Sequence, residues 1–357
     1  MKALYVTSIE NFAGKTAICL GIGKRLQAEG YRIGYLKPLS YEALQRGPEL
    51  VDEDVAFAKN VLALTDDLSD LSPVAMTTAL LPECLGEGDE CGFHDKIKQA
   101  ADRVGQGKDV LLLEGSANLR MGYALGLSTP FVAEMLDAQV LAVVRCRGRL
   151  CMLDDALAAQ FRLHERLLGV VFNRVPEEQM SFVSQQAVPF LEARRIPVLG
   201  ALPERPQLAA ISVGELIDVL KARTLTEEAD RGALVEHLMV GAMSAQEALS
   251  RFRVYPNKAV ITGGDRTDVL LAALETSTTA LILTGNLQPS ATVIQRANER
   301  GVAVLLVSSN TLETVEAIER VFGKTRLGQA EKLAHFEALM AQHLNYKRLF
   351  SLLGLEK

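Results

Sequence analysis

Short apolar runs alternate with helical patterns along the N-terminal part of the chain. Each run has the length of a buried strand, and the segments between the runs carry apolar residues at helical spacing. This alternation is typical of βα units and a largely parallel sheet, so we predict a doubly wound α/β domain over residues 1–212. The predicted strands cover residues 3–7, 31–36, 109–113, 139–144, 168–172 and 197–199.

A second, smaller block of βα units follows a stretch rich in turn residues at 202–206. Three strand-like runs begin at Ala259, Ala280 and Val302, with helical patterns between them. They predict a smaller α/β domain over residues 213–325.

The tail, residues 326–357, repeats a helical spacing that predicts a C-terminal helix with a packing face rather than a cofactor site. The positions that carry this spacing are Leu333, Phe336, Leu339, Met340, His343 and Leu344.

The first predicted strand leads into a sequence suited to phosphate. Residues Ala3–Val6 run through a polar turn into Gly14-Lys15-Thr16, which opens a long helical pattern. A strand that turns through Gly-Lys-Thr into a helix presents backbone N–H groups and the positive helix end to an anion. We therefore predict a nucleotide phosphate at Gly14, with Lys15 on the outer phosphates and the Thr16 hydroxyl on Mg²⁺.

The loop departs from the full phosphate-loop pattern at one position. That pattern has a further Gly where this chain has Ile9. A β-branched residue there indicates either a different loop path, with Ser8 taking part, or weaker nucleotide binding. An ordinary strand–turn–helix with an accidental Gly-Lys-Thr is the alternative interpretation.

Two carboxylates are candidates for holding the metal ion. Glu114 follows the third predicted strand, at the sheet edge where α/β proteins bind their ligands, and Asp52-Glu53-Asp54 opens a helical pattern. Mg²⁺ prefers oxygen ligands, so we predict Thr16, Asp54 (or Asp52) and Glu114 as its ligands. The plainer interpretation of Asp52 and Asp54 is that they start a helix, where acidic residues favour the dipole.

Lys37 and Asn173 complete the predicted site. Lys37 follows the second predicted strand and adds a second positive charge toward the phosphates, so Lys15 and Lys37 are the candidate catalytic residues. Asn173 follows the fifth strand, and its amide has both a donor and an acceptor with which to read an adenine edge.

Together these motifs resemble the dethiobiotin synthetase-like P-loop family, in the version found as the N-terminal region of long phosphate acetyltransferases. The likeness covers roughly residues 1–212. It implies ATP and Mg²⁺ as cofactors, since the matching positions of dethiobiotin synthetases bind both, together with a substrate whose amine is carboxylated. The chain departs from the family at Ile9 and in an acidic, Gly-rich loop at residues 86–90, where a substrate segment would lie. The motifs that carry the likeness are the phosphate loop, Lys37-Pro38, Asp52-Glu53-Asp54, Glu114-Gly115, Gly122, Gly126-Leu127-Ser128 with Pro130, and Asn173-Arg174-Val175.

Residues 213–325 resemble the DRTGG domain, which accompanies the same P-loop domain in phosphate acetyltransferases and occurs beside nucleotide-sensing modules. Here the order is Gly263-Gly264-Asp265-Arg266-Thr267-Asp268, so the signature itself is not literally present. Gly263, Gly264, Asp265 and Arg266 predict a ligand niche or an interface, with Arg266 as the fixed positive charge. Alternatively, the glycines are routine turns, Asp265 caps its helix, and Arg266 pairs with Asp268 or a partner chain.

Composition narrows the partners. Hydrophobic residues make up 48% and charged residues 23% of the 357 residues, which is typical of a packed protein. The net charge of −6 argues against nucleic acid or an anionic membrane as a partner. Because no apolar run has transmembrane length, we expect a cytoplasmic protein.

The cysteines show no zinc-site spacing. Cys19, Cys84, Cys91, Cys146 and Cys151 are scattered, and we expect reduced thiols. His94 lies near Cys91 and is expected to be a solvated loop residue rather than a metal ligand.

Three functions remain open. The first is a regulatory ATP·Mg²⁺-binding protein. The second is an ATP-dependent ligase or carboxylase of the dethiobiotin synthetase type, and the third is an interaction protein with an empty P-loop. The resemblance implies that acetyl transfer needs a large further domain, so we expect none from this sequence. We expect a homodimer through residues 213–325, because so small a sheet covers its edges and helix faces poorly alone.

Overall fold

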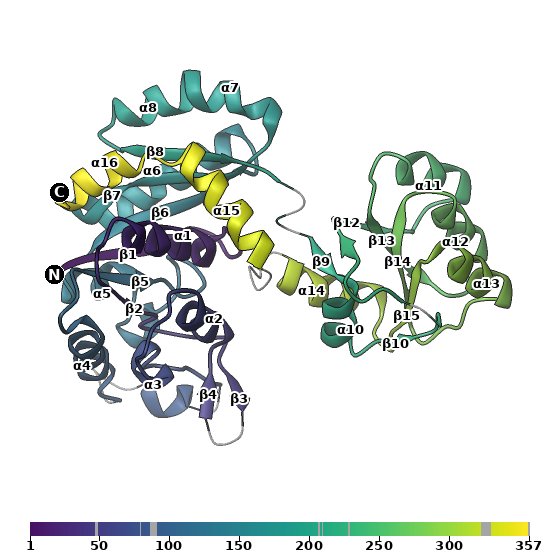
Figure 1. The fold of residues 1–357 in the computed structure, drawn as a ribbon, viewed down its shortest axis with the longest axis horizontal. Coiled ribbons are helices and arrows are strands. Elements are labelled where there is room, and N and C mark those ends of the chain that lie inside the picture. Colours follow the sequence, from purple (N-terminus) through teal and green to yellow (C-terminus); the bar gives the residue numbers. More distant parts are fainter. Residues whose placement is uncertain are drawn as a thin grey trace. The chain divides into compact units, whose positions relative to one another are not determined.

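The chain forms two compact units in this computed structural model. One unit comprises Met1–Glu204 and Leu327–Lys357, and the other comprises Arg205–Arg326 (Figure 1). The second unit is therefore an insertion in the sequence of the first. The predicted substrate loop at 86–90 lies outside the described residues, which are 1–46, 49–78, 80–85, 91–205, 208, 210–227, 229–322 and 330–355.

The first unit is built on a six-stranded sheet in the order β2-β5-β1-β6-β7-β8. All neighbouring strands pair in parallel, which confirms the doubly wound α/β fold and all six predicted strands. The strands are buried almost throughout, as a parallel sheet covered on both faces requires. They are β1 (Lys2–Ser8), β2 (Ile33–Leu36), β5 (Val110–Glu114), β6 (Gln139–Arg145), β7 (Leu167–Val175) and β8 (Val198–Pro203).

The direction in which each connection crosses the sheet determines which face its helix covers. Right-handed crossovers place α1 (Lys15–Ala28), between β1 and β2, on one face. The same rule places the helices between later strands on the other face, because those connections run across the sheet in the opposite direction. These helices are α4 (Phe93–Gly105), α5 (Thr129–Met135), α6 (Arg149–Leu163), α7 (Met180–Phe182) and α8 (Val188–Glu192), with a π-helix at Val183–Ala187 between the last two.

The C-terminal helices complete the α1 face. Helix α15 (Ala330–His343) packs against α1 and β8, and α16 (Tyr346–Leu353) packs against β8 (Figure 1). Met340 is fully buried and occupies the space where a Cβ at Gly21 of α1 would lie. The buried positions Phe336, Leu339, Met340 and Leu344 confirm the predicted packing face. That face is therefore covered within the first unit. It is not available to help the second unit pair with a second copy of the chain.

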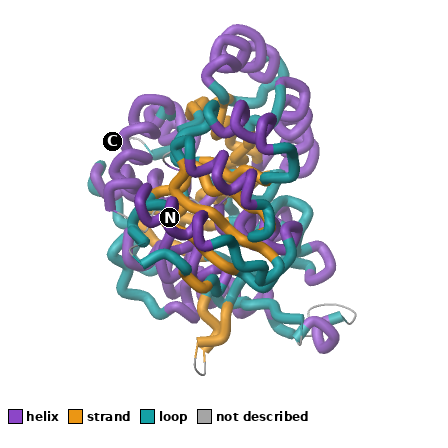
Figure 2. The backbone as a smooth tube through the Cα atoms, turned by 90° about the vertical axis from the view of Figure 1, so that its right-hand side faces the viewer, coloured by secondary structure: helices purple, strands orange, loops and turns teal. Residues whose placement is uncertain are grey.

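The rest of the first unit lies around residues 40–85. Strands β3 (Leu44–Arg46) and β4 (Glu49–Val51) form an antiparallel hairpin that projects from the unit (Figure 2). Helices α2 (Glu53–Val61) and α3 (Leu68–Leu71) follow it. Short 3₁₀ turns cover Leu81–Cys84, Tyr123–Leu125, His164–Arg166 and Glu177–Gln179.

The second unit holds a five-stranded sheet in the order β10-β15-β14-β13-β12. The three predicted strands are present as β13 (Lys258–Gly263), β14 (Thr278–Thr284) and β15 (Ala303–Leu306). Two strands that were not predicted, β12 (His237–Val240) and the antiparallel β10 (Arg223–Thr224), extend the sheet at its edges. Both are short and only partly buried, so they lack the apolar signal of a central strand.

Hydrophobic clusters hold this sheet to its helices. One cluster joins β13, β14 and β15 to α11 (Ala245–Phe252), α12 (Thr267–Leu274) and α13 (Ala291–Arg300). Another joins the same strands to α10 (Val213–Leu220), α14 (Thr311–Phe322) and the small antiparallel pair β9 (Ile211–Ser212) and β11 (Leu234–Val235).

The expectation of five reduced cysteines was wrong for one pair. Cys84, at the end of a 3₁₀ turn, and Cys91, just before α4, form a disulfide with their Cα atoms 5.6 Å apart. The fold brings the two ends of the intervening segment within disulfide range, which spacing along the sequence does not reveal. Cys19, Cys146 and Cys151 are free. His94 lies in the first turn of α4 rather than in a loop, and its ring lies 4.8 Å from that of Phe131.

Candidate nucleotide site

The loop between β1 and α1 has the backbone shape of an anion site. Gly14 precedes α1 with φ 90°, and the described first turn of α1 contains neither an acidic residue nor a side-chain cap. The N–H groups at this helix end are therefore not covered by a side chain of their own turn. Ile9 does not have a positive φ, whereas Phe12 does, at 56°. The loop thus turns at Phe12 and Gly14, and a glycine at position 9 is not required for it.

Lys15 lies against the loop that follows β5. Lys15 is 9% exposed, and its Nζ donates a hydrogen bond to the carbonyl oxygen of Ala117 at 2.7 Å. Burial lowers the pKa of Lys15 to about 8, and the nearby Glu114 carboxylate opposes this shift. The amine remains mostly protonated at neutral pH.

Glu114 joins the phosphate loop to the sheet. Its Oε1 accepts a hydrogen bond from the Thr16 hydroxyl at 2.5 Å, and its Oε2 accepts one from the Tyr35 hydroxyl at 2.8 Å. Glu114 is 1% exposed, and burial raises its pKa, although the Lys37 ammonium acts in the opposite direction. The structure therefore brings Thr16 and Glu114 together, as the predicted metal site requires.

Tyr35 is a site residue that sequence reasoning missed. It lies on β2, is fully buried, and reaches Glu114 on β5. The available signal was a hydroxyl-bearing side chain in the middle of an otherwise apolar strand. A buried tyrosine hydroxyl usually finds a polar partner, so that signal indicates an acceptor on a neighbouring strand.

Lys37 is held by the two aspartates. Its Nζ lies 2.7 Å from Oδ2 of Asp52 and 3.3 Å from Oδ2 of Asp54. Burial alone would lower the pKa of Lys37, but the carboxylates of Asp54, Asp52 and Glu114 outweigh it and raise the pKa. Lys37 is therefore a permanent cation at this end of β2.

The contacts of Asp52 are those of a structural residue rather than of a metal ligand. It is the N-cap of α2, where its Oδ1 accepts from the backbone N–H groups of Asp54 and Val55 at 2.9 and 3.2 Å. Its Oδ2 accepts from Ser40 at 2.5 Å and pairs with Lys37. The cap of α2 and the pairing with Lys37 both serve the local fold, so the helix-start interpretation describes Asp52. Asp54 keeps 29% of its side chain exposed beside Lys37.

Asn173 holds the phosphate loop from β7. Its Nδ2 donates to the carbonyl oxygen of Ala13 at 2.8 Å, and a Cβ at Gly14 would overlap this amide. Gly14 is therefore required both by its positive φ and by its contact with Asn173. Reading of an adenine edge by Asn173 stays a prediction.

The residues present suit Mg²⁺ bound together with a nucleotide. The described residues contain no group of three or more His, Cys, Asp or Glu side chains that could hold a metal alone. Mg²⁺ commonly takes only one or two carboxylates and completes its shell with phosphate oxygens and water. Thr16, Glu114 and Asp54 offer such a set. The Thr7 hydroxyl, at the end of β1, is buried at the same sheet edge without a hydrogen-bond partner among the described residues.

The residues of the predicted niche in the second unit make contacts within that unit. Arg266 donates from Nη2 to the carbonyl oxygen of Met243 at 2.8 Å, and its Nε lies 3.5 Å from Asp268. Arg266, not Asp265, is the N-cap of α12, and no side chain caps that helix. A Cβ at Gly264 would overlap the carbonyl oxygen of Leu287, so this turn requires glycine for close packing.

Comparisons with known proteins agree with this architecture. Residues 2–212 match the family described as AAA domain, and residues 215–321 match the DRTGG domain. A phosphate acetyltransferase of Nitrosomonas europaea is 24% identical over 99% of this chain and 52% of its own length. An ATP-dependent dethiobiotin synthetase of Caldicellulosiruptor saccharolyticus is 30% identical over 33% of this chain and 49% of its own length. The chain spans about half the length of the curated relatives it matches.

Among solved structures, one similar chain contains the CBS and DRTGG domains from the regulatory region of Clostridium perfringens pyrophosphatase, in complex with diadenosine tetraphosphate. It is 25% identical, covers 32% of this chain and 48% of its own, and has a TM-score of 0.28. No helix within the described part of the chain is long and apolar enough to span a membrane.

Proposed function

We propose that this chain, which belongs to the AAA domain family over residues 2–212 and carries a DRTGG domain, is a regulatory protein that binds ATP with Mg²⁺. The N-terminal half of phosphate acetyltransferases has the same pair of domains. The observation that carries the proposal is the cluster at the start of α1. There Lys15, Thr16 and the buried Glu114 meet beside an uncapped helix end. We propose the cytoplasm as its location.

Each residue of the cluster has a defined task in this proposal. The N–H groups after Gly14 bind phosphate oxygens, and Lys15 turns from Ala117 to the outer phosphates. Thr16 and Glu114 hold Mg²⁺ with Asp54, and the ion neutralises charge on the phosphates. Lys37 stays bound to Asp52 and adds positive potential at the end of β2.

Calorimetric titration of ATP into Lys15→Ala tests nucleotide binding. Removing a cation that faces several phosphates in a partly dry site costs several kcal/mol, so we expect a loss of affinity of more than about a hundredfold. Lys24→Ala is the matched control, because it removes the same charge from the same helix away from the loop. Equal affinities of the two variants contradict the proposal and favour an interaction protein with an empty loop.

We further propose that two chains pair through the second unit. Leu287 is 46% exposed and lies beside Gly263 and Gly264 at the carboxyl ends of its strands. Light scattering of the full chain at about 100 µM, well above a micromolar dissociation constant, should show a dimer. Leu287→Asp should give a monomer, whereas Val254→Asp, at the opposite end of the strands, should not. A monomeric parent protein refutes the pairing.

A ligase or carboxylase of the dethiobiotin synthetase type is the second candidate function. The observation in its favour is Lys37, a buried cation beside Lys15 that can stabilise charge on a transferred phosphoryl group. Release of ADP that depends on bicarbonate and an amine substrate supports this candidate. ATP binding without such release favours the regulatory role.

A further inference from the structure

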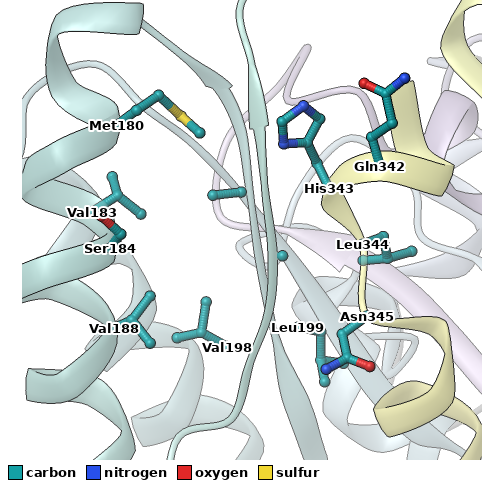
Figure 3. A pocket seen from close by; sticks show the side chains of 12 residues that line it. Met180, Val183, Ser184, Val188, Val198, Leu199, Gln342, His343, Leu344 and Asn345 are labelled. Atoms are coloured by element: carbon teal, nitrogen blue, oxygen red, sulfur yellow. The ribbon is translucent and has the colours of Figure 1, made fainter. Parts of the chain in front are cut away.

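A cavity lies at the edge of the six-stranded sheet. It has a volume of about 340 Å³ and surrounds part of the edge strand β8 (Figure 3). The π-helix at Val183–Ala187 and its neighbours in α7 and α8 form one wall, and the end of α15 with the segment that joins it to α16 forms the other. None of its lining residues belongs to the candidate nucleotide site. The volume falls within the range of sites for small molecules.

The two walls differ in polarity. Figure 3 shows Met180, Val183, Val188 and Val198 on one side of β8, and Gln342 and His343 on the other. The apolar wall is partly open, since Val183 is 1% and Val198 9% exposed, whereas Met180 and Val188 are half-buried and Ser184 is exposed. The twelve described residues that line the cavity include no Lys, Arg, Asp or Glu. An apolar ligand with one hydrogen-bonding end matches this lining, and a strongly charged ligand does not.

The π-helical wall follows from the sequence. Pro189 has no backbone N–H, so it cannot complete the α-helical hydrogen bond expected of its position, and the preceding turn widens. Single π-helical turns occur frequently at functional sites, because the widened turn moves side chains out of the helical register. Here it places Val183 and Ser184 on the cavity wall.

The opposite wall is fixed by backbone pairing. Leu344 bridges to Gly200 of β8, and the N–H of Asn345 donates to the carbonyl oxygen of Leu199 at 2.7 Å. A Cβ at Gly200 would overlap the carbonyl oxygen of His343, so this approach requires glycine. Both walls are therefore formed before any ligand arrives, which lowers the entropic cost of binding.

We propose that this cavity is a second binding site, for an uncharged short aliphatic molecule with one hydrogen-bonding end. The aliphatic part contacts Met180, Val183, Val188 and Val198. The polar end lies toward the polar wall formed by Gln342 and His343. The site is separate from the nucleotide site and does not depend on the function proposed above.

Ligand-observed saturation-transfer NMR on the full chain tests the site, with hexanamide as the probe. Hexanoate, the charged counterpart of the same length, is the comparison. We expect hexanamide to bind at least about tenfold more tightly than hexanoate, because the lining contains no Lys or Arg side chain to pair with a carboxylate. Binding of hexanoate as tightly as hexanamide contradicts the proposed chemistry.

Two variants locate the probe. Ser184→Trp fills the cavity from the π-helix and should weaken hexanamide binding by about tenfold or more. Ser181→Trp is the control, because it adds the same ring at an exposed position outside the lining and should leave hexanamide binding unchanged. Ala201→Leu narrows the cavity from β8 and should also weaken binding. Thermal unfolding verifies that each variant is folded. The proposal is wrong if hexanamide fails to bind the parent protein at about 10 mM, or if it binds Ser184→Trp, Ala201→Leu and Ser181→Trp equally.

Discussion

Replacing Glu114 by Gln separates the metal role of this residue from its structural role. The substitution keeps the shape of the side chain and removes its negative charge. In the parent protein, the two carboxylate oxygens accept hydrogen bonds from Thr16 and Tyr35, and the group is 1% exposed. Glu114→Gln therefore removes one buried charge and turns one of the two acceptor oxygens into a donor group.

The expected cost to the fold is small. One of the two hydroxyls must turn away from the new NH₂ group, which loses a charge-assisted hydrogen bond of about 1.5–3 kcal/mol. A neutral amide also avoids the desolvation cost that raises the pKa of Glu114, which offsets much of this loss. We expect the free energy of unfolding to change by less than about 2 kcal/mol.

The expected cost to nucleotide binding depends on Mg²⁺. Loss of one anionic ligand should weaken ATP binding about ten- to hundredfold with Mg²⁺, or about 1.4–2.8 kcal/mol, and by little in EDTA. Calorimetric titrations under both conditions measure this difference. Tyr35→Phe is the companion variant, because it keeps the Glu114 charge and removes only one hydrogen bond, so its effect with Mg²⁺ should be smaller. An equal loss for Glu114→Gln with and without Mg²⁺ shows that Glu114 is structural and refutes the reasoning.

Three further predictions concern other residues. Asp52→Asn removes the carboxylate nearest to the Lys37 ammonium, so the free energy of unfolding measured by urea denaturation should fall by about 3 kcal/mol. An unchanged midpoint contradicts a stabilising buried pair. Gly14→Ala forces its Cβ onto the amide of Asn173, so ATP binding measured by calorimetry should fall by more than about tenfold; parent-like affinity would show that the loop adapts. Burial lowers the pKa of Lys258 from 10.5 to about 8. Between these two pH values the unfolded chain binds more protons than the folded chain, so the second unit gains stability as pH rises through this range. Lys258→Met should abolish that rise in thermal unfolding, and a persisting rise would assign it to another group.

The sequence alone determined the framework of the first unit. Buried parallel strands are continuous apolar runs, so their positions are encoded locally, and all six were found from that signal. The meeting of Thr16 with Glu114 was also predictable. The start of the helix that follows β1 and the end of β5 must lie at the same edge of a parallel sheet.

Only the tertiary structure decided which side chains are paired within that edge. Asp52 and Asp54 are equivalent in the sequence, but the start of α2 assigns Asp52 to the helix cap and to Lys37. Asn173 reaches Ala13 across 160 residues of sequence, and no local pattern encodes a contact of that separation. The Cys84–Cys91 disulfide joins residues only seven apart, and it was missed because the spacing does not show that their Cα atoms lie 5.6 Å from each other.

The placement of the C-terminal helices has the same physical origin. Their apolar spacing determined that they would pack, because a helix with an apolar stripe must bury it. The partner was decided by the handedness of the crossovers, which covers one face of the sheet with most helices and leaves room beside α1 on the other. Local patterns therefore determined the central strands and the main helices, and long-range packing determined the edge strands β10 and β12 and which segments and side chains meet.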